Sequence, residues 1–125
     1  AVLGAAFKPD SDDIRDSPAL DIAEAARLGG ALVTCFDPKA MGNARRVHPE
    51  LLYAESVEEA CADADVVLHL TEWAQFRQID PALLRSVVSV PSIVDGRNTL
   101  DPVLWRGAGW TYRALGRPTP GRPNV

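Results

Sequence analysis

A charged segment near the start of the chain, residues 7–17, holds the residue types that bind polar ligands. It begins with Phe7 and Lys8, continues through Arg15 and several aspartates, and contains almost nothing that a core would bury. The segment lies between a run of small apolar residues and Ser17, a residue type that often caps the start of a helix. Loops between a core strand and the next helix commonly contact ligands in α/β proteins. Lys8 there supplies a mobile charge with three donors, suited to hydroxyls, phosphate or a carboxylate.

Two further polar motifs directly follow apolar runs that predict strands. Thr71-Glu72-Trp73 follows one of these runs and Asp95-Gly96-Arg97 follows another. The glycine permits a sharp turn, and the planar guanidinium of Arg97 can grip an oxyanion through two hydrogen bonds. Because ligands lie beyond the carboxyl ends of parallel strands, we expect all three motifs on one rim, with Lys8 and Arg97 in reach of one anionic ligand.

The elements that must position these motifs alternate between strand and helix. This alternation predicts an α/β fold in a single domain, a Rossmann-like, doubly wound parallel sheet in three layers. Strands are expected at 2–6, 31–36, 65–70, 92–94 and 110–115, with a weaker strand at 51–54, and helices at 18–28, 40–46, 57–62, 76–87 (interrupted at 80–81) and 102–106. We expect the domain to span 1–117 and the proline-rich tail 118–125 to be disordered.

Composition limits the classes of function. The net charge of −4 over 125 residues argues against a nucleic-acid or anionic-membrane surface, since both need a basic field. No apolar run approaches the roughly 18 residues of a membrane span. Cys35 and Cys61 lack CxxC spacing, which predicts small core residues in a reducing cytoplasm. The chain begins inside an expected strand, which suggests a domain of a longer protein.

Metal and dinucleotide sites find little support in the sequence. His48 and His69 have no neighbouring residues at metal-ligand spacing, so no metal site is expected. Asp37, after the second expected strand, imitates the ribose-binding acid of a dinucleotide fold. The first turn lacks G-x-G-x-x-G, however, so its backbone cannot cradle a pyrophosphate in the usual way.

Several motifs, in this order, resemble the C-terminal, UDP-binding domain of the UDP-glucose/GDP-mannose dehydrogenase family. The resemblance covers about residues 2–117 and rests on 7–9 with 12–18, 71–73 with 76–77, 95–98, and 109–112 with 116–117. Within the family, the motifs at 71–73 and 95–98 are most similar to those of UDP-glucose 6-dehydrogenases.

This resemblance implies a domain that binds a nucleotide sugar, whose C6 alcohol the family oxidises twice to a carboxylate with NAD⁺. It implies substrate contacts for Phe7, Lys8 and Arg97, and a contact toward NAD for Arg15. The family's NAD-binding domain and its central region with the catalytic cysteine lie upstream. We therefore expect those domains as partners, a homo-oligomeric parent, and no catalytic residue or activity in this chain alone.

Each of these assignments has a structural alternative. Lys8 can be a solvated loop lysine, and Arg97 can serve only in an ion pair with Asp95 or another acid of the rim. Arg15 stands among aspartates that can form a purely local salt bridge with it. Phe7 can be a core residue, a ring that stacks on a uracil base, or a source of backbone contacts.

The remaining expectations concern structural residues and other classes of protein. The aspartates of the first loop are expected to hold the helix start, and Trp73 to pack at the sheet rim. A UDP-N-acetylmannosamine or GDP-mannose dehydrogenase domain and a free-standing nucleotide-binding module remain alternatives. A receiver-type signalling domain is disfavoured. It needs an acidic pair, an aspartate and a lysine after three of its strands, and this chain has Phe7-Lys8, Thr71 and Arg97 there, a pattern that favours anion binding over Mg²⁺ binding.

Overall fold

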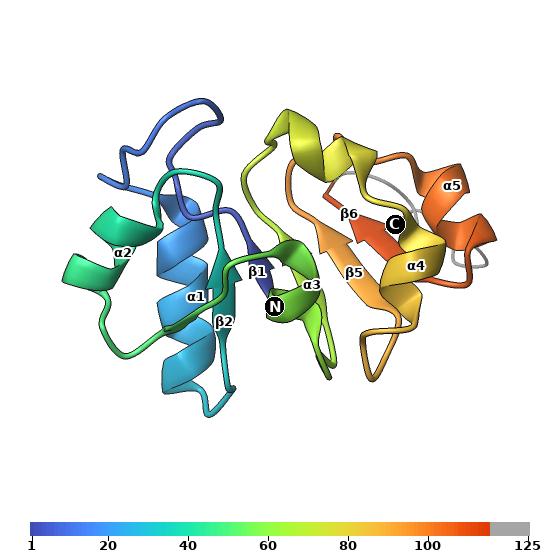
Figure 1. The fold of residues 1–125 in the computed structure, drawn as a ribbon, viewed down its shortest axis with the longest axis horizontal. Helices are drawn as coiled ribbons and strands as arrows, with labels where there is room; N and C mark the ends of the chain where they lie inside the picture. The colour runs from blue at the N-terminus through green and yellow to red at the C-terminus, as the bar shows by residue number, and fades with distance from the viewer. Residues whose placement is uncertain (116–125) are drawn as a thin grey trace.

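Six parallel strands form the sheet in the order β3-β2-β1-β4-β5-β6 in the computed structural model, which describes residues 1–115 (Figure 1). They are β1 (Val2–Leu3), β2 (Thr34–Phe36), β3 (Leu52–Tyr53), β4 (Val67–His69), β5 (Ser92–Asp95) and β6 (Thr111–Ala114). The direction of winding reverses between β1 and β4, which is the position where doubly wound sheets bind ligands. The α/β, Rossmann-like prediction is confirmed. The predicted tail, 118–125, lies outside the described residues.

Helices connect the strands and cover both faces of the sheet. They are α1 (Pro18–Leu28), α2 (Met41–Val47), α3 (Val57–Cys61), the 3-10 helix η1 (Ala74–Gln78), α4 (Pro81–Arg85) and α5 (Pro102–Gly107). Right-handed crossovers put α1 and α2 on one face and α3, α4 and α5 on the other. Figure 1 shows α1 beside α2 at one end of the molecule and α4 beside α5 at the other. Within residues 1–115, no helix is long and apolar enough to cross a membrane.

The core lies between the sheet and these helices. Its largest fully buried side chains include Trp105, Tyr112 and Phe76. Cys35 and Cys61 are buried as predicted, and burial raises the pKa of their thiols to about 12 and about 11. A thiol that stays protonated at neutral pH is a poor nucleophile, so both cysteines are packing residues.

The first strand is shorter than predicted, because Gly4 turns the chain away from the sheet. Gly4 has a φ of +110°, a conformation that favours glycine. A Cβ at this position would lie 2.5 Å from the Cβ of Thr71, which follows β4. The loops after β1 and β4 therefore meet at this glycine, and Ala5 and Ala6 are buried outside the strand.

Candidate functional site

The side chain of Arg97 joins the loops that follow three neighbouring strands. Its Nε donates to the carbonyl of Leu70 at 2.8 Å, and its Nη2 lies 3.4 Å from the carbonyl of Phe7. The same Nε lies 3.2 Å from a carboxylate oxygen of Glu72. The three predicted motifs thus share one rim, at the switch point of the sheet. The Arg97 side chain is 30% exposed, so the guanidinium remains reachable from solvent.

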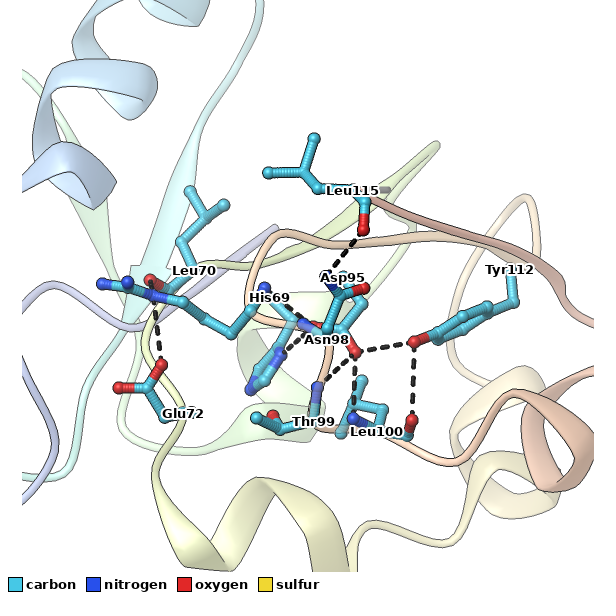
Figure 2. A network of polar contacts seen from close by, with 10 residues as sticks. His69, Leu70, Glu72, Asp95, Asn98, Thr99, Leu100, Tyr112 and Leu115 are labelled. Atoms are coloured by element: carbon cyan, nitrogen blue, oxygen red, sulfur yellow. Dashed lines mark hydrogen bonds and ion pairs between the residues drawn. The ribbon is translucent and has the colours of Figure 1, made fainter. Parts of the chain in front are cut away.

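The turn that carries Arg97 is built around the buried carboxylate of Asp95 (Figure 2). Burial alone would raise the pKa of Asp95, but converging hydrogen bonds hold it well below its usual range. Asp95 does not pair with the guanidinium of Arg97, whose acidic partner is Glu72. One oxygen of Asp95 accepts from Nδ1 of His69 and the amides of Arg97 and Asn98, and the other from the amides of Thr99 and Leu100 and the hydroxyl of Tyr112.

A second buried carboxylate, Asp37, lies after β2 and ties together the loops of the other half. Its Oδ2 accepts from the amides of Ala5 and Ala6 at 2.8 and 2.9 Å and from Nε1 of Trp73 at 3.1 Å. Its Oδ1 accepts from two amides of its own turn. Asp37 therefore has no role as a ribose-binding acid. Trp73 is 5% exposed, as the packing prediction requires.

Phe7 and Lys8 lie at the exposed side of the rim. The amide of Phe7 donates to the carbonyl of Asp13 at 2.7 Å, which fixes the backbone, while the ring is 47% exposed. The core alternative for Phe7 is therefore wrong. Lys8 is exposed and forms no hydrogen bond or salt bridge within residues 1–115. The backbone carbonyl of Phe7 lies 3.4 Å from Nη2 of Arg97, so the loop that carries Phe7 and Lys8 contacts the Arg97 side chain.

Arg15 forms the local salt bridge that the sequence left as an alternative to a ligand contact. Its Nε and Nη2 lie 3.0 and 2.8 Å from the two carboxylate oxygens of Asp13. This pairing lowers the pKa of Asp13 to about 2. The Arg15 side chain is 87% exposed, and it lines a cavity of about 410 Å³ with Asn43 and Arg46 of α2.

The aspartates of the first loop do not cap α1, contrary to the prediction. The hydroxyl of Ser17 caps this helix, accepting from the amide of Leu20 and donating to the carbonyl of Ala5 at 2.8 Å. Asp10 and Asp16 instead occupy turn positions with φ of 61° and 55°, which aspartate tolerates better than most residues.

Sequence reasoning missed Glu72 and Tyr112 as parts of the site. Glu72 lies within the motif at residues 71–73, and its side chain is 28% exposed beside Arg97. Tyr112 is buried on β6, and only the fold brings its hydroxyl to Asp95. A cavity of about 710 Å³ also opens near Phe36, between α3 and α4, but none of the predicted site residues lines it.

The sequence model of the UDP-glucose/GDP-mannose dehydrogenase family, UDP binding domain, matches residues 1–102. The chain belongs to this family. A UDP-glucose 6-dehydrogenase of Rhizobium meliloti (strain 1021) is 42% identical over 118 residues, which cover 94% of this chain and 27% of the relative.

Solved structures of family enzymes share the fold. A UDP-glucose dehydrogenase of Pyrobaculum islandicum matches with a TM-score of 0.73 and 32% identity, over 90% of this chain and 24% of that one. A UDP-D-ManNAc dehydrogenase of Pyrococcus horikoshii matches with a TM-score of 0.75 and 27% identity, over 93% of this chain and 25% of that one. The chain thus spans about a quarter of the length of these proteins.

Proposed function

We propose that this chain is the substrate-binding domain of an NAD-dependent UDP-glucose 6-dehydrogenase, which oxidises UDP-glucose to UDP-glucuronate. The observation that carries the proposal is the contact of Arg97 with the loops after β1 and β4, at the switch point of the sheet. Family membership supports a UDP site, and the relative from Rhizobium meliloti supports glucose as the sugar.

In the proposed site, three side chains contact different parts of the nucleotide sugar. Nε of Arg97 is occupied by Leu70 and Glu72, and Nη2 lies 3.4 Å from the carbonyl of Phe7. Nη1 and the remaining N–H of Nη2 are therefore the part of the fork that turns to an anionic group of the ligand. Lys8 adds a mobile charge for the diphosphate or for the sugar carboxylate. The half-exposed ring of Phe7 suits stacking on a planar base.

The loop after β1 offers no cradle for NAD. The amides of Ala5 and Ala6, where a dinucleotide fold would hold a pyrophosphate, are bound to the carboxylate of Asp37. Our proposal gives Arg15 a single outward contact with the cofactor, which is bound mainly by upstream domains of a homo-oligomeric parent enzyme. Hydride transfer would be the chemistry that NAD supplies there, so we expect residues 1–117 alone to be inactive.

Titration of the chain with UDP, UDP-glucose, UDP-N-acetylmannosamine and GDP-mannose tests the proposal by calorimetry and NMR. We expect weak binding that prefers the uridine nucleotides, because the cleft is shared with domains outside this chain. Arg97→Ala and Lys8→Ala should each reduce affinity, whereas Lys39→Ala removes the same charge from the next loop and should not. Equal effects of the two lysine variants, or preference for GDP-mannose, would contradict the proposed site.

Two observations distinguish this proposal from a free-standing nucleotide-binding module: the sequence of the parent gene and the dehydrogenase activity of its product. A dehydrogenase gene would encode a G-x-G-x-x-G segment and a glycine-rich cysteine segment upstream. We expect the chain to produce no NADH from UDP-glucose, and the protein encoded by the whole gene to do so. Turnover by the chain alone would contradict the proposal that catalysis needs the upstream domains. The sugar is decided by comparing UDP-glucose with UDP-N-acetylmannosamine, the substrate named for the Pyrococcus horikoshii relative.

A further inference from the structure

The carboxylate of Asp95 receives more hydrogen bonds than its turn requires. An aspartate that stabilises a turn needs to accept only one or two amides of its own loop. Asp95 accepts the amides of Arg97 and the three residues after it. It also accepts a side-chain hydrogen bond from each neighbouring strand, from His69 on β4 and Tyr112 on β6, as Figure 2 shows.

Among the described residues, the donors around Asp95 include no lysine or arginine side chain, since they are four backbone amides, the hydroxyl of Tyr112 and Nδ1 of His69. Nδ1 of His69 lies 2.8 Å from Asp95, and within residues 1–115 the buried Nε2 has no hydrogen-bond partner. The guanidinium of Arg97 in turn makes its ion pair with Glu72 and not with Asp95.

The geometry of the turn sends the Arg97 side chain away from Asp95 and over the ends of the adjacent strands. Asp95 fixes the Arg97 amide at 3.0 Å, and the next residue, Asn98, takes a φ of 59°. From this anchored backbone the Nε reaches the carbonyl of Leu70 at 2.8 Å. Glu72 contacts the same Nε, and Nη2 lies 3.4 Å from the carbonyl of Phe7, so these contacts use one edge of the guanidinium.

We propose that Asp95, held by His69 and Tyr112, is the positioning residue that aims the Nη groups of Arg97 at the ligand. The proposal rests on the proposed function, because it takes Arg97 as the group that binds the nucleotide sugar. The hydroxyl of Tyr112 donates to Asp95 at 2.7 Å and lies 3.4 Å from the carbonyl of Leu100 in the same turn, so Tyr112 supports the turn that carries Arg97. A pre-aimed guanidinium loses less conformational entropy on binding than a free one.

The decisive variant is Tyr112→Phe, which removes one donor from Asp95 and keeps the ring that the core needs. Its matched control is Trp73→Phe, which removes one donor from Asp37. The Nε–Hε signal of Arg97 in an NMR spectrum of the free chain, identified by its loss in Arg97→Ala, reports the aim of the side chain without ligand. We expect Tyr112→Phe and Asp95→Asn to shift this signal and increase its solvent exchange, and Trp73→Phe to leave it in place.

Affinity for UDP then tests whether the aim matters. We expect Tyr112→Phe to weaken binding by about threefold to tenfold in the wild-type chain, and to have no further effect when Arg97 is already alanine. An equal loss in both backgrounds would mean a general structural role and would overturn the proposal. An unmoved Arg97 signal in Tyr112→Phe would overturn it as well, even if Asp95→Asn fails to fold. If the signal shifts but the wild-type chain binds no nucleotide, the proposed function fails while the control of Arg97 by Asp95 stands.

Discussion

Asp37 and Asp95 are two buried carboxylates at matching places in the two halves of the sheet. Asp37 follows β2 and Asp95 ends β5, and both side chains are fully buried. They differ in which loops supply their hydrogen-bond donors. Asp37 binds amides of the β1 loop as well as its own turn, whereas Asp95 takes its backbone donors from its own turn alone.

The two sets of donors distinguish a closed half of the rim from a half in which Arg97 is partly exposed. In the first half, the carboxylate of Asp37 stands where a phosphate would lie in a dinucleotide fold, and it closes that cradle. In the second half, Asp95 satisfies its turn and leaves Arg97 extended across the ends of β4 and β1. A buried carboxylate therefore occupies the pyrophosphate position in one half and, in our proposal, orients the charged group of the ligand site in the other.

The largest expected effect comes from neutralising either carboxylate. We expect Asp37→Asn and Asp95→Asn each to lower the free energy of unfolding by about 3 kcal/mol or more, because an amide NH₂ would face N–H donors inside the protein. Chemical denaturation measures this loss, and Asp65→Asn on the exposed surface serves as the control. A loss below about 1 kcal/mol in one variant would show that only the other carboxylate organises its half.

A substitution at the contact between the β1 and β4 loops should lower the stability of the fold nearly as much. Gly4→Ala forces a side chain into a positive φ and against Thr71, so we expect a loss of at least about 2 kcal/mol in unfolding free energy. Gly107→Ala in α5 is the matched control, since its Cβ would meet nothing within 4 Å. The control should be neutral or slightly stabilising. Equal stability of both variants would mean that the β1 and β4 loops move apart freely.

The sequence was sufficient for the fold and for bringing the motifs together, since both follow from local patterns. Pro18 and Ser17 set the start of α1, and strand–helix alternation sets a parallel sheet whose carboxyl ends share a rim. The roles of the acids were not predictable in this way. Asp37 imitates a ribose ligand in sequence, and only the packing of Trp73 and the β1 loop turns its carboxylate inward.

Lowering the pH should reduce the stability that the charged Asp95 carboxylate contributes to the fold. Its folded pKa lies below that of an unfolded aspartate, about 3.9, so the unfolded chain takes up the proton first as pH falls. The stability from Asp95 is therefore complete above that pH and declines below it. We expect denaturation midpoints to show a smaller loss of stability below about pH 4 in Asp95→Asn than in the wild-type chain. Parallel pH profiles would contradict this.

The smallest effect concerns Asp13, an acid that owes its low pKa to a single partner at the surface. Removal of the guanidinium in Arg15→Ala should raise the pKa of Asp13 from about 2 toward its ordinary value, with little change in stability because the pair is exposed. A carboxyl ¹³C NMR titration measures the shift, and Arg46→Ala from the same cavity wall is the control. A pKa that stays near 2 in Arg15→Ala would assign it to the loop backbone. If the pKa of Asp13 shifts in Arg15→Ala and not in Arg46→Ala, the low pKa of Asp13 depends on Arg15. The pKa of Asp13 would then return toward its ordinary value when Arg15 binds another anion, whereas the pKa of Asp95 is lowered by several donors inside the protein.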